Sequence, residues 1–151
     1  MHVYDTRETA MQALTALGAQ ACHSVAELTR QVDIVITMLP NSADVESVVL
    51  GTNGVLANAR DSAQDDLLLI DMSTIAPAST DKPAAALGEA GVALVDAPVG
   101  RTVAFAERGE SLFMVGASHN DMGRVKPILE GMGTVIHRRS ARQRHPHQAD
   151  Q

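Results

Sequence analysis

The sequence has little of three features that mark common functional classes: cysteine, aromatic residues and long apolar runs. It holds one cysteine, no tryptophan, one tyrosine and two phenylalanines in 151 residues. Cys22 therefore cannot close an internal disulfide or contribute to a cysteine zinc cluster, which fits a reducing cytoplasm and a small buried side chain. With so few rings the chain offers no stacking platform for bases, and its core must be aliphatic.

Charge and hydropathy exclude two further kinds of partner. The formal net charge of −6 argues against nucleic acid. No run of about 18 apolar residues is present to span a membrane, and polar residues follow Met1 where a signal peptide would be apolar. The length suits one hydrophobic core. We therefore expect a cytoplasmic protein that binds neither nucleic acid nor membrane.

Short apolar runs alternate with helical patterns along the chain. The runs that we expect to form strands are His2–Asp5, Ala19–Cys22, Asp33–Leu39, Leu67–Ile70, Val92–Val95, Leu112–Val115 and Thr134–His137. Helices of roughly ten residues separate most of them, and this alternation predicts an α/β fold with a mostly parallel sheet. The pair at 92–95 and 112–115 reads as strands buried on both faces and joined by a small-residue loop.

Capping residues mark where the helices should begin. Ser24 with Glu27 forms a capping box, and Ser118 precedes a helix over 121–132. The other expected start signals are Thr6 for a helix that reaches Leu17, Asn41 or Ser42 for the helix after the third strand, and Pro83 in the first turn of a helix over 79–90. Pro127 must kink its helix or lie in the first turn.

Polar and small residues follow several strands at the point where each should end. They are Asp5, Leu39-Pro40-Asn41, Asp71-Ser73-Thr74 and Asp96-Pro98-Gly100-Arg101. In open parallel sheets ligands bind beyond the carboxyl ends of the strands, so this placement predicts a binding edge. A single aspartate at a strand end is more often a turn former, and the repetition is what favours a site.

Arg101 is the side chain with the clearest binding chemistry. Pro98 and Gly100 turn the chain and let a ligand approach the backbone, while a guanidinium carries five donors suited to a carboxylate, sulfonate or phosphate. The alternative is a surface ion pair of Arg101 with Asp96 or Glu107. The residue types alone leave both interpretations open.

The tail over 138–151 departs from the pattern of the preceding 137 residues. It is rich in arginine and histidine and holds no large apolar residue, which predicts a solvated, disordered end. Nothing rigid presents His145 and His147 to a metal, so we expect no metal site there. The expected organisation is one partial domain over 1–137 followed by this basic tail.

Five segments in register resemble the β-hydroxyacid dehydrogenases, the group that includes 3-hydroxyisobutyrate dehydrogenase and sulfolactaldehyde reductase. They are ITMLPN (36–41), IDMSTIAP (70–77), VDAPVGRT (95–102), GESLFMVG (109–116) and KPILEGMG (126–133). The family's common substrate loop reads DAPVSGG, and the DAPVGRT of this chain is most similar to the sulfolactaldehyde reductase version. The resemblance runs from about residue 2 to residue 137.

The resemblance implies a Rossmann-type, doubly wound fold and assigns residues to its site. Asp5 would bind the adenosine ribose and favour NAD over NADP. Leu39, Pro40 and Asn41 would line the adenosine side of the cofactor, and Thr74 would stand near the nicotinamide. Gly100, Arg101 and Thr102 would bind a small anionic hydroxyacid or aldehyde, with Arg101 on its anionic head.

Two family features have no counterpart in the sequence. One is the first strand with its G-x-G-x-x-G loop, which meets the cofactor pyrophosphate. The other is the helix with the catalytic lysine and the helical domain behind it, which forms the family's homo-oligomer interface; after His137 this chain reads RRSARQRHPHQADQ. Lys126 lies in another helix and does not match that lysine.

These departures imply a truncated fragment with an incomplete Rossmann-type sheet, no catalytic residue and no turnover of its own. The alternatives are a non-catalytic dinucleotide-binding or interaction module, and a gene remnant without a role. A response-regulator receiver is rejected, because Asp33 starts its strand instead of ending it. Opening the middle of the sheet also predicts aggregation or partial folding.

Overall fold

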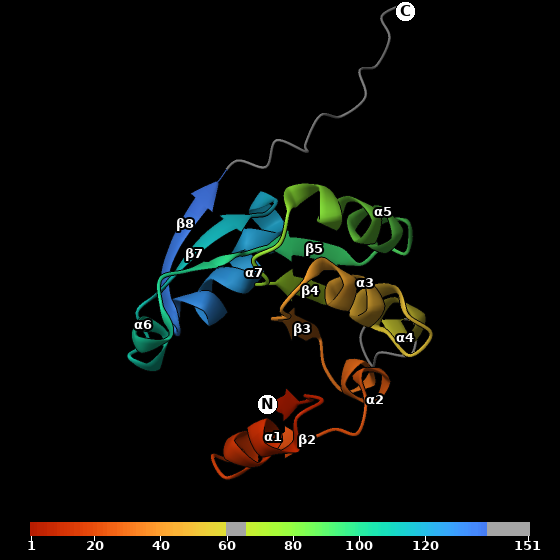
Figure 1. Ribbon diagram of the computed structural model, residues 1–151. Helices are drawn as coiled ribbons and strands as arrows, with labels where there is room; N and C mark the ends of the chain where they lie inside the picture. Colours follow the sequence, from red (N-terminus) through yellow and green to blue (C-terminus); the bar gives the residue numbers. More distant parts are fainter. Residues whose placement is uncertain (60–65, 139–151) are drawn as a thin grey trace, which may run out of the picture. The chain divides into compact units, whose positions relative to one another are not determined.

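The computed structural model describes residues 1–59 and 66–138, and Figure 1 shows its helices and strands in order. The chain divides into two compact units, residues 1–95 and residues 96–151. The basic tail expected over 138–151 lies outside the described residues except for Arg138, which ends a strand. No helix of the described residues is both long and apolar enough to cross a membrane.

The first unit contains a parallel strand pair and the helices packed on it. β3 (Ile34–Thr37) runs parallel to β4 (Leu68–Asp71), with Ile34 opposite Leu68 and Thr37 opposite Asp71. β4 is also next to β5 (Ala93–Asp96). The helices that accompany them are α2 (Val25–Arg30), α3 (Ser42–Leu50), α4 (Val55–Asn58), the short 3₁₀ helix η2 (Pro77–Thr80) and α5 (Asp81–Glu89).

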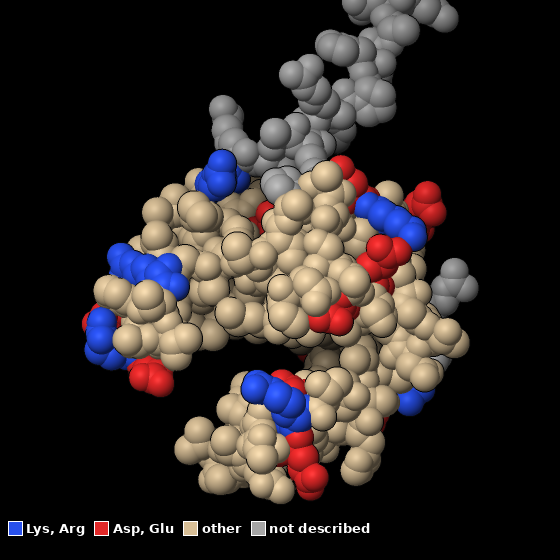
Figure 2. Space-filling view, viewed as in Figure 1, with Lys and Arg blue, Asp and Glu red and all other residues tan. Residues whose placement is uncertain are grey.

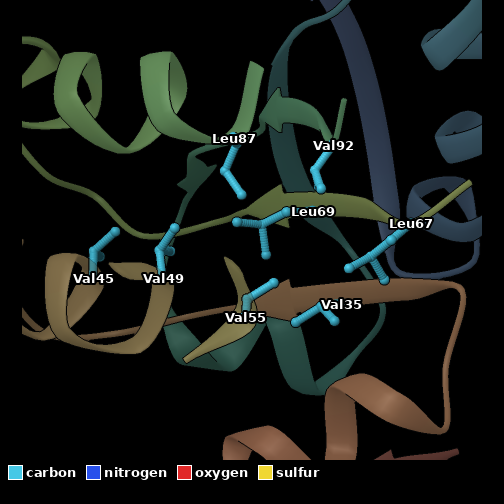
Figure 3. Packing of buried hydrophobic residues seen from close by; sticks show 8 residues of the cluster. All are labelled: Val35, Val45, Val49, Val55, Leu67, Leu69, Leu87 and Val92. Carbon is cyan, nitrogen blue, oxygen red and sulfur yellow. The ribbon is translucent and has the colours of Figure 1, made fainter. Parts of the chain in front are cut away.

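An aliphatic cluster forms the core of this unit. Figure 3 shows its eight buried side chains, which come from the helices α3, α4 and α5 and from the strands or the residues beside them: Val35, Val45, Val49, Val55, Leu67, Leu69, Leu87 and Val92. All four residues of β4 are buried, as expected for a strand covered on both faces. This cluster holds no aromatic ring, but the expectation of a wholly aliphatic core was wrong, because Phe113 in the second unit is buried, at 1% exposure.

The first 21 residues form a separate small assembly without buried side chains. β1 (His2–Val3) pairs in parallel with β2 (Gln20–Ala21), and α1 (Glu8–Thr15) connects them. Leu17, just beyond α1, is 85% exposed. Among the described residues β1 pairs only with β2, and β3 is an end strand of its sheet. The sequence predicts an opening between these two strands, and among the described residues no pairing closes it.

The described part of the second unit, residues 96–138, is a small sheet with two helices. Its elements after Asp96 are β6 (Val99–Gly100), α6 (Val103–Glu107), β7 (Ser111–Gly116), α7 (His119–Glu130) and β8 (Gly133–Arg138). β7 is parallel to β8 over six residues and antiparallel to β6. Asp96 also pairs antiparallel with Gly116.

Most element boundaries follow the sequence signals, and three expectations about the helices and strands were wrong. The helix expected after Thr6 has Arg7 at its N-cap, without a side-chain capping bond. The connection between the strands at 92–95 and 112–115 is no simple loop, because it contains β6 and α6. β7 is not buried on both faces, since its burial alternates and Met114 is 37% exposed. The α/β class with mostly parallel pairing is confirmed.

Candidate functional site

The ends of β3 and β4 are joined by a buried hydrogen-bond network that the sequence did not reveal. The Oδ1 atom of Asp71 accepts hydrogen bonds from Thr37 Oγ1 and from the backbone N–H of Ser73, both at 3.0 Å. Ser73 Oγ in turn accepts the backbone N–H of Leu39 at 2.9 Å. The side chains of Thr37, Asp71 and Ser73 are all buried. The network thus links the two strand ends where the sequence predicts cofactor contacts.

The predicted cofactor residues of these strand ends lie on both sides of the network. Leu39 is half-buried, while Pro40, Asn41 and Thr74 are exposed. The Asn41 side chain caps α3, because its Oδ1 accepts the backbone N–H of Asp44 at 2.9 Å. Asn41 therefore has a structural role at the start of a helix in addition to any contact with a ligand.

Asp5 lies beyond β1 and is exposed. Its Oδ1 accepts the backbone N–H of Arg7 at 2.7 Å and lies 3.7 Å from the Nε atom of the same arginine. The carboxylate is thereby oriented by the turn that leads into α1. An acceptor held at a strand end in this way suits the hydroxyl groups of a ribose.

The segment of the second unit that the sequence predicts to bind substrate contains a residue in a strained conformation. Arg101 has φ +72°, and among the described residues it is the one non-glycine with positive φ. Such a conformation costs about 1–3 kcal/mol in a non-glycine residue and is found preferentially at functional sites. Gly100 precedes it in β6, and Thr102 follows as the N-cap of α6, its carbonyl accepting the Phe105 N–H at 3.1 Å.

The Arg101 guanidinium is held by a carbonyl and a ring. Its Nη1 donates to the backbone oxygen of Glu110 at 3.0 Å, and its Cζ lies 5.2 Å from the centre of the Phe105 ring. Arg108 also lies over that ring, at 4.8 Å, and its Nε is 3.1 Å from Glu110 Oε2. The partners that the structure gives Arg101 are thus neither Asp96 nor Glu107. Among the described residues the contacts of its guanidinium are a neutral carbonyl and a ring, and such a cation suits an anionic ligand.

The surface around these elements is of mixed charge. Figure 2 shows basic and acidic side chains together at the place of α6, and acidic side chains interspersed with basic ones near α5. On this face the charges form small groups separated by uncharged surface. This face therefore presents local cations among acidic groups instead of one continuous basic patch.

Cys22 is the first buried residue of the chain, at 1% exposure. Burial raises the pKa of its thiol above the ordinary value of 9.0, and the nearby negative charge of Glu27 raises it further. A thiol with a raised pKa is a poor nucleophile at neutral pH. Cys22 is therefore a structural residue, as its isolation in the sequence predicts.

Parallel β–α units with polar residues at the strand ends are typical of doubly wound α/β proteins, which bind ligands at that edge. The chain belongs to the family described as the NAD binding domain of 6-phosphogluconate dehydrogenase, whose model matches residues 1–140. The resemblance to the β-hydroxyacid dehydrogenases is confirmed by curated relatives. The chain is 38% identical over 136 residues to the NAD-dependent L-serine dehydrogenase of Pseudomonas aeruginosa and 37% identical over 136 residues to the 3-sulfolactaldehyde reductase of Escherichia coli.

A solved structure shows the same fold. The 3-hydroxyisobutyrate dehydrogenase of Mycobacterium tuberculosis with L-serine matches at a TM-score of 0.78 and 33% identity, over 88% of this chain and 44% of that one. The two curated relatives are matched over 90% of this chain and 44% of their own length. The chain thus spans less than half the length of the relatives that it matches.

Proposed function

We propose that this chain is the cofactor-binding part of an NAD-dependent oxidoreductase that acts on the CH–OH group of a small β-hydroxyacid. The observation that carries the proposal is the edge formed by β3 and β4, where buried hydrogen bonds fix two loops at the carboxyl ends of parallel strands. Membership of an NAD-binding family supports a nicotinamide cofactor at that edge. When bound, this cofactor would supply hydride transfer.

Each residue at the edge would contact a different part of the cofactor. Asp5 would accept hydrogen bonds from the ribose hydroxyls, and its negative charge would repel the 2′-phosphate of NADP. Leu39, Pro40 and Asn41 would line the adenosine side, and Thr74 would stand near the nicotinamide. NAD is therefore the favoured cofactor.

The substrate would be an anion of the 3-hydroxyisobutyrate or sulfolactate type. Gly100, Arg101 and Thr102 would form its binding segment, with the guanidinium of Arg101 on the carboxylate or sulfonate. Two observations support this role: the strained backbone at Arg101, and a guanidinium whose contacts are a carbonyl and a ring. Charge-assisted hydrogen bonds of this kind are worth about 1.5–3 kcal/mol each.

The 151 residues should bind without turnover. They contain no G-x-G-x-x-G loop for the pyrophosphate and no residue that matches the family's catalytic lysine. Loss of a positioned proton donor costs a factor of about 10²–10⁴ in rate. The absence of the lysine also favours the second candidate function, a non-catalytic dinucleotide-binding module.

Two assays on the purified chain test the proposal. In the first, fluorescence titration with NADH should show saturable binding that NAD displaces. In the second, NADH formation from 3-hydroxyisobutyrate or L-serine should stay at background. An absence of NADH binding would contradict the proposed function, and turnover at the rate of an intact family enzyme would contradict the expected inactivity.

A further inference from the structure

The ends of β3 and β4 are held in register by both backbone and side chains. Thr37 lies opposite Asp71 in the parallel pair, and the backbone N–H of Met72 donates to the carbonyl of Thr37 at 2.8 Å. At the same pair of residues the side chains are also bonded, because Thr37 Oγ1 donates to Asp71 Oδ1. These residues are 34 positions apart in the sequence. The bonds therefore fix where the two chain segments leave the sheet.

Asp71 is the exception in an otherwise apolar strand. The other residues of β4, Leu68, Leu69 and Ile70, are fully buried, and Asp71 itself is only 3% exposed. A buried carboxylate is costly unless its hydrogen bonds are made, and an apolar residue at such a position would normally serve stability as well or better. Asp71 therefore fits a role in holding specific groups in place.

The groups that Asp71 holds carry most of the proposed cofactor contacts. Its bond to the Ser73 N–H fixes the turn after β4, just before Thr74. Ser73 then binds the N–H of Leu39 and so fixes the loop after β3, just before Pro40 and Asn41. Because this N–H is already bonded to Ser73, a ligand at this edge would meet the side chain or carbonyl of Leu39 instead.

We propose that Asp71 is a positioning residue for the dinucleotide: through Thr37 and Ser73 it sets the spacing of the two loops that would contact the cofactor. The proposal rests on the proposed function, because it assigns a purpose to the edge already suggested for cofactor binding. Thr37 and Ser73 act with Asp71 as one unit. None of the three needs to touch the cofactor.

Single-atom changes in the network test this role against a matched control. Thr37→Val removes the hydroxyl donor to Asp71, and Ser73→Ala removes the acceptor for Leu39. Thr29→Val is the control, because Thr29 is fully buried and its hydroxyl donates to the carbonyl of Val25 within α2, at 2.8 Å. All three changes delete one buried hydroxyl group with one known hydrogen bond.

The expected result separates stability from binding. Thr37→Val should lower the urea midpoint at least as much as Thr29→Val, because it also removes a hydrogen bond from a buried carboxylate. Thr37→Val and Ser73→Ala should weaken NADH binding about tenfold, whereas Thr29→Val should weaken it less than about twofold. Asp71→Asn keeps an Oδ1 acceptor and should retain affinity within about threefold, while Asp71→Ala should not. If Thr37→Val and Ser73→Ala bind NADH as tightly as Thr29→Val, the proposal is overturned.

A second measurement distinguishes failure of this inference from failure of the proposed function. Exchange of the Leu39 amide proton, followed by NMR, should become about tenfold faster in Ser73→Ala and stay unchanged in Thr29→Val. If the unmodified chain does not bind NADH, the proposed function and the cofactor role both fail, and faster exchange would leave Asp71 as a loop-fixing residue only. Unchanged Leu39 exchange in Ser73→Ala would overturn the positioning role itself.

Discussion

Residues 1–21 and residues 22–95 fold by different means although both consist of strands and helices. The first segment makes a parallel strand pair and an eight-residue helix, yet none of its side chains is buried. The second places eight aliphatic side chains in one cluster. Local hydrogen bonds shape both segments, but apolar burial, the dominant stabilising term of folding, acts only on the second. An amphipathic pattern alone therefore does not secure a buried helix.

The sheet pairing accounts for the difference. β1 and β3 each lack one neighbour among the described residues, so the apolar side of α1 has no strand of the main sheet beneath it. Apolar side chains are exposed near both elements: Leu17, just after α1, is 85% exposed, and Met38, just after β3, is 62% exposed. Open edges with apolar side chains are sites of association.

The largest expected difference between the two segments is in the response to truncation of a leucine. Leu69→Ala should reduce the free energy of unfolding by about 2–5 kcal/mol, because it leaves a cavity at a fully buried position. Leu17→Ala makes the same chemical change at an exposed position and should cost less than about 0.5 kcal/mol. Urea denaturation measures both variants, and equal losses would contradict the contrast between the segments.

Arg101 should show that an exposed residue can control binding without controlling stability. Arg101→Ala should weaken binding of 3-hydroxyisobutyrate in the presence of NADH by about 1.5–3 kcal/mol, and Arg101→Lys should restore only part of it, because an ammonium lacks the planar fork. Arg108→Ala is the control, since Arg108 contacts the same ring but is paired with Glu110. Equal effects of the two alanine variants would favour a general charge effect over a specific site.

The reactivity of the Cys22 thiol tests where the buried part of the chain begins. Its thiol should react with a disulfide reagent at least about tenfold more slowly than a cysteine placed at the exposed position 17 in a Leu17→Cys, Cys22→Ser variant. If Cys22 reacts as fast as the exposed cysteine in the folded protein, residue 22 does not belong to the buried part of the chain.

The raised pKa of Cys22 also predicts a pH dependence. Because the folded chain holds the thiol proton more tightly than the unfolded chain, its contribution to stability is present below pH 9.0 and is lost as the pH rises above it. The urea midpoint of the unmodified chain should therefore fall more between pH 8 and pH 10 than that of Cys22→Ser.

The smallest expected effect is on the choice of cofactor at Asp5, in the segment without buried residues. Asp5→Asn should improve binding of NADP relative to NAD about fivefold, or ~1 kcal/mol, since removal of the charge removes repulsion of the 2′-phosphate but the site is exposed. Glu8→Gln removes the same charge on the neighbouring helix and should leave the ratio unchanged. Calorimetry that shows tighter NADP binding by the unmodified chain would overturn the assignment of Asp5.

The helix caps were predictable from the sequence because they depend on residues close together in the chain. Ser24 and Ser118 cap α2 and α7 as expected, and Asn41 caps α3, because each cap involves residues only three positions apart. Pro83 lies in the first turn of α5 as expected, whereas Pro127 lies inside α7. α4 escaped prediction because its N-cap is Gly54, which offers no side-chain bond.

The candidate site is less predictable because it depends on distant contacts. The strand-end motifs pointed to Leu39 and Thr74, but the bond between Thr37 and Asp71 joins residues that only the sheet register brings together. The same is true of Arg101, whose carbonyl partner lies nine positions away across a short helix. A pattern of residue types cannot distinguish that carbonyl from a carboxylate partner.

Hydrogen exchange of the backbone amides tests the contrast between the two segments most directly. Under native conditions the amides of β1, α1 and β2 should exchange at least about 100-fold faster than those of β3 and β4, because only the latter are covered by the aliphatic core. Mass spectrometry of peptides from 1–21 and from 34–37 with 68–71 gives both rates in one experiment. Equal protection of the two sets would contradict the account.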